Sequence, residues 1–300
     1  MTISTLQMYR QGVNSMLDQQ ARLLQTQQQL STGKRINNPA DDPSGAVNVL
    51  DLTQALALTD QYQRNISQAK TRLETEDTVL TSATDLIQRA RELTVQGLNG
   101  TVSTAQRSAI AQEIRQLHDE MLSLANRKDG NGDYLFAGMK VGTTPFVESG
   151  AGTVSYQGDQ GQRSIQVAND RQVADSDNGL AVFMKVPSAG GGYEDIFTTL
   201  DKIATGLESN APDSASLDQI DNALQHLGAV DSGVGARLNV LDSQSATHDA
   251  IALNLKDARS GIEDLDYASA AARLSQQTVA LQAAQQAFAR VQGLTLFNYL

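Results

Sequence analysis

The feature that most constrains this fold is an apolar repeat, spaced alternately by three and four residues, at each end of the chain. Such spacing places one apolar stripe along a helix and is typical of a coiled-coil seam. The N-terminal seam consists of Leu6, Tyr9, Val13, Met16, Leu23 and Leu30, with Gln20 and Gln27 as polar interruptions. The repeat therefore predicts a long N-terminal helix that packs against other helices.

The C-terminal segment carries a matching seam. It consists of Tyr267, Leu274, Leu281, Phe288, Val291, Leu296, Phe297 and Leu300, and Ala270, Gln277 and Ala284 supply its alternate row. Further alanines recur on the other faces, which would let helices approach closely from several sides. One partner helix would not cover all of these faces, so we expect neighbouring subunits to cover the rest.

Each terminal helix is set off by a break in the pattern. Gly33, Pro39, Pro43 and Gly45 interrupt the first helix, because proline lacks an N–H donor and glycine frees the backbone. A second break is expected at Ser260–Gly261. We therefore expect residues 1–45 and 260–300 to form a separate two-helix assembly module, although ordinary packing of these helices on the central bundle is the alternative.

Two helices alone bury little surface, and isolated helices are marginal in water. We therefore expect the terminal module to lie on the inner side of an assembly. It is expected to be disordered in the free monomer and to become ordered only when neighbouring subunits pack against it.

The middle of the chain predicts a helical bundle with a small β insertion. Ile66, Leu73, Leu80 and Ile87 recur every seven residues in a helix expected over about 46–96, and Ser103 with Gln106 predicts a capping box for the next helix. Helical spacing returns at about 196–207 and 217–241. Residues 129–192 instead show glycine, turns and short alternating segments, with strands expected at 153–156, 163–167 and 181–186.

The expected fold class is mainly α with a small β insertion, built as a long antiparallel coiled-coil-like helical bundle. Its domains are the terminal module, a bundle at 46–136 plus 193–259, and a β domain at 137–192.

No constellation of residues predicts catalysis, a metal site or a cofactor. Cysteine is absent, so no thiol nucleophile or thiolate metal site exists. Asp129, Asn131 and Asp133 resemble the start of a calcium loop, but Tyr134 and Lys140 occupy positions that need glycine and a carboxylate, so a tight turn is expected. The histidines, His118, His226 and His248, lack metal-ligand spacing. The chain is expected not to be an enzyme.

Charge and hydropathy exclude other classes of partner. A net charge of -11 opposes binding to nucleic acid or to an anionic membrane surface. No apolar run approaches the roughly 18 residues that a membrane-spanning helix needs, so membrane insertion is not expected. The first residues also lack the charge and apolar pattern of a cleavable signal peptide.

The segment from Leu30 to Gly45 closely resembles the signature that follows the first helix in the flagellin superfamily. The joint residues that carry this resemblance are Gly33, Arg35, Ile36, Asn37, Asp41, Asp42, Pro43 and Gly45. Residues 262–268 resemble the segment that opens the last helix in the same superfamily, and residues 235–239 fit that superfamily too. The motifs at 134–138, 156–159, 163–167 and 296–300 resemble its hook–filament junction members more than its filament subunits.

This resemblance implies a structural subunit of the bacterial flagellum that acts as an adaptor between the hook and the flagellin filament. Its expected partners are copies of itself in a ring, the first hook-associated protein, flagellin, and an export chaperone on the C-terminal helix. It implies an extracellular location, reached through the flagellar type III export system. A flagellin filament subunit is the nearest alternative, and a secreted host-binding adhesin or enzyme is an alternative of another class.

Overall fold

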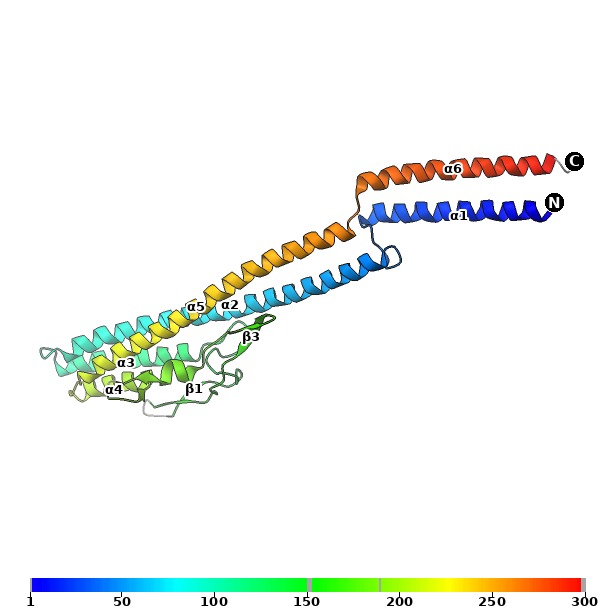
Figure 1. Cartoon of the computed structure of the whole chain (residues 1–300). Coiled ribbons are helices and arrows are strands. Elements are labelled where there is room, and N and C mark those ends of the chain that lie inside the picture. The colour runs from blue at the N-terminus through cyan, green and yellow to red at the C-terminus, as the bar shows by residue number, and fades with distance from the viewer. Residues whose placement is uncertain (1, 150–152, 189, 298–300) are drawn as a thin grey trace. The chain divides into compact units, whose positions relative to one another are not determined.

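The computed structural model describes residues 2–149, 153–188 and 190–297, with side chains described in these ranges except at 2–6, 8 and 291–297. The described chain is mostly helical (Figure 1). It divides into two compact units, one formed by Met1–Thr59 with Ala250–Leu300 and the other by Asp60–Asp249.

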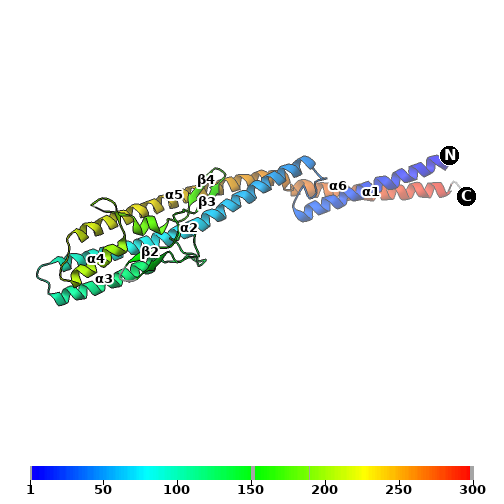
Figure 2. The same cartoon turned by 90° about the horizontal axis from the view of Figure 1, so that it is seen from below.

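The terminal unit pairs the two end helices. Helix α1 spans Thr2–Thr32 and helix α6 spans Tyr267–Phe297. They lie side by side and antiparallel in both views (Figures 1 and 2). The start of helix α2, Pro43–Leu98, and the end of helix α5, Ala215–Glu263, complete this unit.

The expected break at Ser260–Gly261 is wrong, because α5 continues to Glu263. A single glycine costs a helix only about 1 kcal/mol relative to alanine, so Gly261 does not end it. The break lies at residues 264–266 instead. Asp266 begins α6 there, since its Oδ1 accepts hydrogen bonds from the backbone N–H groups of Ala268 at 3.0 Å and Ser269 at 3.3 Å.

The central unit is a bundle of α2, α5, α3 (Thr104–Ala125) and α4 (Ile196–Glu208). The predicted heptad on α2 faces its core, where Leu73, Leu80 and Ile87 are buried. The predicted capping box is confirmed, because the Ser103 side chain accepts from the N–H of Gln106 while the Gln106 side chain accepts from the N–H of Ser103. It satisfies donors that the first turn of α3 would otherwise leave unpaired.

The β insertion consists, among the described residues, of three separate antiparallel pairs. These are β1 (Phe146–Glu148) with β2 (Val154–Tyr156), β3 (Ser164–Ala168) with β4 (Arg171–Ala174), and β5 (Val186–Pro187) with β6 (Tyr193–Glu194). The expected strands at 153–156 and 163–167 are confirmed, and the fold class expected from sequence is confirmed with them.

The expected strand at 181–186 is mostly wrong. Residues Leu180–Met184 form a short π-helix, η1, and only Val186 begins a strand. Val182 and Phe183 are neighbours in sequence and both fully buried. A strand would send these two side chains to opposite faces. The helical turn instead brings Phe183 against Phe136 and Phe146, with ring centroids 5.1 Å and 5.5 Å away.

Candidate assembly site

The joint after α1 begins with a glycine in a left-handed backbone conformation. Gly33 has φ of +73° and its N–H donates to the carbonyl oxygen of Gln29 at 2.8 Å, which is the usual way for glycine to end a helix. Two buried residues, Ile36 and Gly45, hold the turn that follows. A Cβ at Gly45 would lie 2.7 Å from Cδ1 of Ile36, so only glycine fits beside it.

Two aspartates shape the rest of this turn. Asp41 Oδ2 accepts from the N–H groups of Asn37 at 3.0 Å and Asn38 at 2.9 Å. Asp42 Oδ1 accepts from the N–H of Gly45 at 2.9 Å, with Pro43 in the first position of α2. These backbone hydrogen bonds hold the pKa of both carboxyls below the ordinary value. Asp42 therefore caps the start of α2, and Asp41 holds the turn that precedes it.

The two joints are tied directly to each other. The N–H of Arg35 donates to the carbonyl oxygen of Glu263 at 2.7 Å, and the N–H of Leu265 donates to the carbonyl oxygen of Gly33 at 3.0 Å. Lys34 Nζ lies 2.5 Å from Glu263 Oε1. The backbone pairing fixes the end of α1 beside the start of α6, and it involves residues of the predicted joint motif.

Most described residues of the predicted seams are half-buried in the terminal unit, and the tyrosines Tyr9 and Tyr267 are exposed. Val13, Met16, Leu23 and Leu30 of α1 are half-buried, as are Leu274, Leu281 and Phe288 of α6. The rings of Tyr9 and Phe288 lie 5.2 Å apart between centroids. Tyr267 is exposed, although its hydroxyl reaches the backbone of Gly33. The side chains of Leu6, Val291, Leu296, Phe297 and Leu300 lie outside the described residues.

A second apolar row was missed from the sequence. Leu17 and Leu24 on α1 are 57% and 56% exposed, and Val279 on α6 is 62% exposed. They face away from the α1–α6 contact, and the seven-residue spacing of the two leucines was the signal for this row. More apolar side chains of the same unit, Val47, Leu50, Leu58 and Leu253, are also exposed.

The other candidate positions are engaged in local structure. Asp129 Oδ1 accepts from the N–H groups of Asn131 and Asp133, and its Oδ2 pairs with Arg72, so this segment is a turn. His226 and His248 contact the backbone oxygens of Ala181 and Val167. Within the described residues, no His, Cys, Asp or Glu group is arranged to hold a metal ion, and no helix is long and apolar enough to cross a membrane.

Comparison with known proteins identifies the family. The family model for the bacterial flagellin N-terminal helical region matches residues 3–141, and the model for its C-terminal helical region matches residues 217–300. Flagellar hook-associated protein 3 of Escherichia coli (strain K12) is 33% identical over 99% of both chains. The chain belongs to the flagellar hook-associated protein 3 family of the flagellin superfamily.

Other relatives agree with this membership. Flagellar hook-associated protein 3 of Salmonella typhimurium is 31% identical over 99% of both chains, whereas flagellin of Bacillus subtilis is 26% identical over 86% of this chain and 85% of its own. The solved FlgL structure from Xanthomonas campestris has a TM-score of 0.63 at 24% identity, covering 70% of this chain and 99% of that one. The family likeness expected from the joint motifs is confirmed, and the chain is a flagellar protein.

Proposed function

We propose that this member of the hook-associated protein 3 family is the adaptor between the flagellar hook and the flagellin filament. The observation that carries the proposal is the full-length match to hook-associated protein 3 at 33% identity, which exceeds the match to flagellin in both identity and extent. Its role is structural, and it has no catalytic step.

The working surface in this proposal is the terminal module. Its inner seam pairs α1 with α6, and its outer row presents Leu17, Leu24 and Val279 to solvent. Fully burying a leucine or valine side chain contributes about 1.5–3 kcal/mol. Neighbouring copies in a ring, the first hook-associated protein below and flagellin above would supply the surfaces that bury this row.

Assembly is then coupled to ordering. The two terminal helices bury only one stripe each within the chain, so we propose that residues 1–45 and 260–300 are disordered in the free monomer and fold as neighbours pack on them. The chain would leave the cell unfolded through the flagellar type III pathway, with an export chaperone holding the apolar face of the C-terminal helix.

The flagellin relative supports a second candidate, a filament subunit. The two candidate functions differ in whether the purified chain polymerises by itself. Purified chain would be incubated with and without fragments of flagellin filament as seeds, and the products would be sized by electron microscopy. An adaptor does not form long filaments under either condition, whereas a filament subunit extends the seeds.

A further inference from the structure

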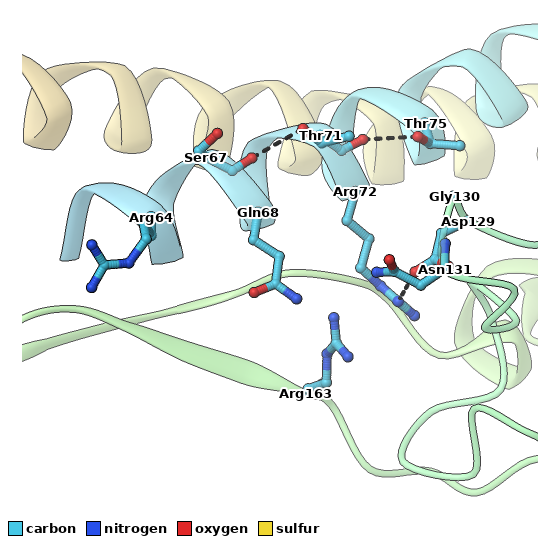
Figure 3. Close-up of a pocket in the computed structure, with 10 residues that line it drawn as sticks. All are labelled: Arg64, Ser67, Gln68, Thr71, Arg72, Thr75, Asp129, Gly130, Asn131 and Arg163. Atoms are coloured by element: carbon cyan, nitrogen blue, oxygen red, sulfur yellow. Dashed lines mark hydrogen bonds and ion pairs between the residues drawn. The ribbon is translucent and has the colours of Figure 1, made fainter. Parts of the chain in front are cut away.

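A cleft of about 370 Å³ lies in the central unit between α2 and the β insertion. One wall is a polar face of α2, which carries Arg64, Ser67, Gln68, Thr71 and Thr75 (Figure 3). The opposite wall is the turn at residues 129–131 and the side chain of Arg163. The proposed assembly role uses none of these residues.

The cleft is cationic although the chain is acidic. Three arginines line it and only one carboxylate, that of Asp129, does so. Asp129 pairs with Arg72, and Arg163 pairs through Nε and Nη2 with the buried Asp175 behind the wall. Arg64 has no ion pair within the described part of the chain. Asp133 is a further carboxylate near Arg72 and Arg163, so the positive charge that has no carboxylate partner in the cleft is that of Arg64.

Donor groups in the cleft have unused hydrogen-bonding capacity. Arg72 is 3% exposed, and its Nε has no hydrogen-bond partner among the described residues. Arg163 Nη1 and the Gln68 amide likewise have no partner in those residues, and the two side chains point toward each other across the cleft in Figure 3. Of these donors only Arg72 Nε is buried, so leaving it unsatisfied costs free energy that a bound acceptor would recover. The Gln68 side chain is exposed and is free to donate.

The arginines also repel one another. Burial first, and then the nearby positive charge of Arg163, lowers the pKa of Arg72 from its ordinary value. Because two guanidinium groups face the same space, an anion between them would be attracted by both. Guanidinium groups match the planar, bidentate geometry of carboxylate and phosphate oxygens.

We propose that this cleft binds a small oxyanion, a carboxylate or phosphate group with one or two negative charges, held by Gln68, Arg72 and Arg163, while Arg64 at the edge of the cleft adds positive charge. The net charge of -11 disfavours long polyanions, because their remaining charges would meet a repulsive surface. A compact anion lies within reach of the arginines and gains their attraction directly.

The test titrates the full chain separately with inorganic phosphate and with malonate, at an ionic strength held constant with chloride. Nuclear magnetic resonance would follow the arginine Nε–H signals and the backbone amides of residues 64–75 and 129–131. The proposal expects saturable shifts in these signals for phosphate, malonate or both, and the better binder then assigns the oxyanion class. Shifts that fail to saturate, or that chloride reproduces, would overturn it and indicate only an adventitious ion.

Variants make the test specific. Gln68→Ala removes an exposed side chain that has no hydrogen-bond partner in the described residues, so the variant should fold. It should weaken the apparent affinity about five- to tenfold, as expected for the loss of a hydrogen bond to a charged ligand. Gln61→Ala, at an exposed glutamine of α2 outside the cleft, is the matched control and should bind as the parent chain does. Equal binding by the parent and Gln68→Ala chains would contradict the proposal.

Discussion

Arg35 donates two hydrogen bonds to the backbone carbonyl oxygen of Ile262, from Nη2 at 2.7 Å and from Nε at 3.2 Å. The same guanidinium contacts Asp42 at the start of α2, with Nη1 3.2 Å from Oδ2. One side chain therefore joins the segment after α1 to the segment before α6. A lysine at this position would keep the positive charge but lose the planar guanidinium group, whose several N–H donors make these contacts.

Arg35→Lys should therefore loosen the joint. In assembled particles, the amide of Leu265 should exchange its hydrogen about tenfold faster, which corresponds to a loss of roughly 1.4 kcal/mol. Arg273→Lys changes an exposed arginine on α6 and should leave this exchange rate unchanged. Equal protection of the Leu265 amide in the parent and Arg35→Lys particles would show that the guanidinium contacts do not stabilise the joint.

Gly33→Ala should destabilise the assembled module, because φ at this position is +73° and a Cβ would also lie 2.7 Å from the Tyr267 hydroxyl. The backbone conformation costs a non-glycine residue about 1–2 kcal/mol, while the tyrosine can move aside. The measurement is the temperature at which assembled particles release subunits. Gly261→Ala, inside α5 with no atom within 4 Å of its Cβ, should instead leave this temperature unchanged or raise it.

Glu76 makes the stability of the central unit depend on pH. Burial first, and then the negative charge of Asp177, raises the pKa of this carboxyl to about 8, although Arg237 and the N–H of Asp177 oppose the shift. Its Oε1 accepts from that N–H at 3.1 Å, and Arg237 of α5 forms an ion pair with Asp177.

The direction of this pH dependence follows from the number of protons that the folded and unfolded states bind. Below pH 4.5, the ordinary value for the side chain, Glu76 is protonated in both the folded and the unfolded state. Between that pH and about 8 only the folded state keeps the proton, so stability falls by up to roughly 1.4 kcal/mol per pH unit. Above about 8 the loss levels off.

Glu76→Gln should flatten this slope while preserving the shape of the side chain. Urea unfolding of the central unit at several pH values measures it. Asp85→Asn is a control, because it removes a carboxyl of α2 that is not buried. If the Glu76→Gln and parent chains lose stability equally between pH 5 and about 8, Glu76 is not the linked group.

The outer row should matter for assembly and not for the fold of the central unit. Leu24→Ser and Val279→Ser remove apolar side chains that are 56% and 62% exposed in the single chain. If neighbours bury them, each change should weaken subunit association by tenfold or more, since burial of such a side chain contributes about 1.5–3 kcal/mol. Light scattering or sedimentation measures association, and urea unfolding checks the central unit.

The matched control for this row is Gln28→Ser, an exposed polar position on α1 one turn after Leu24. Association that is unaffected by both apolar substitutions would mean that neighbours leave this row uncovered.

The sequence predicted what depends on local periodicity and capping. The heptads placed Leu73, Leu80 and Ile87 in the core, and Ser103 with Gln106 marked the start of α3, because both signals act over one or two helical turns. The break before α6 was misplaced because it depends on the cap at Asp266, and on Leu265 pairing with Gly33, a residue distant in sequence.

The outer row and the cationic cleft required the three-dimensional structure. The heptad placed Met16 in the seam and left its neighbour Leu17 outside it, but the structure was needed to show that Leu17 remains exposed in the described chain. Gln68 lies on α2 and Arg163 lies in the loop just before β3, and no local pattern brings them to one cleft. The π-helix at Leu180–Met184 likewise depends on aromatic residues of the distant core.

The most direct test of the central claim is to locate the chain by electron microscopy. Gold-labelled chain would be added to purified hooks that carry the first hook-associated protein, and flagellin would follow. If the chain is the adaptor, the label should be confined to the distal end of each hook, and filaments should grow only from labelled ends. Long filaments made of the labelled chain, or filament growth that proceeds equally well without it, would show that the chain is not the adaptor.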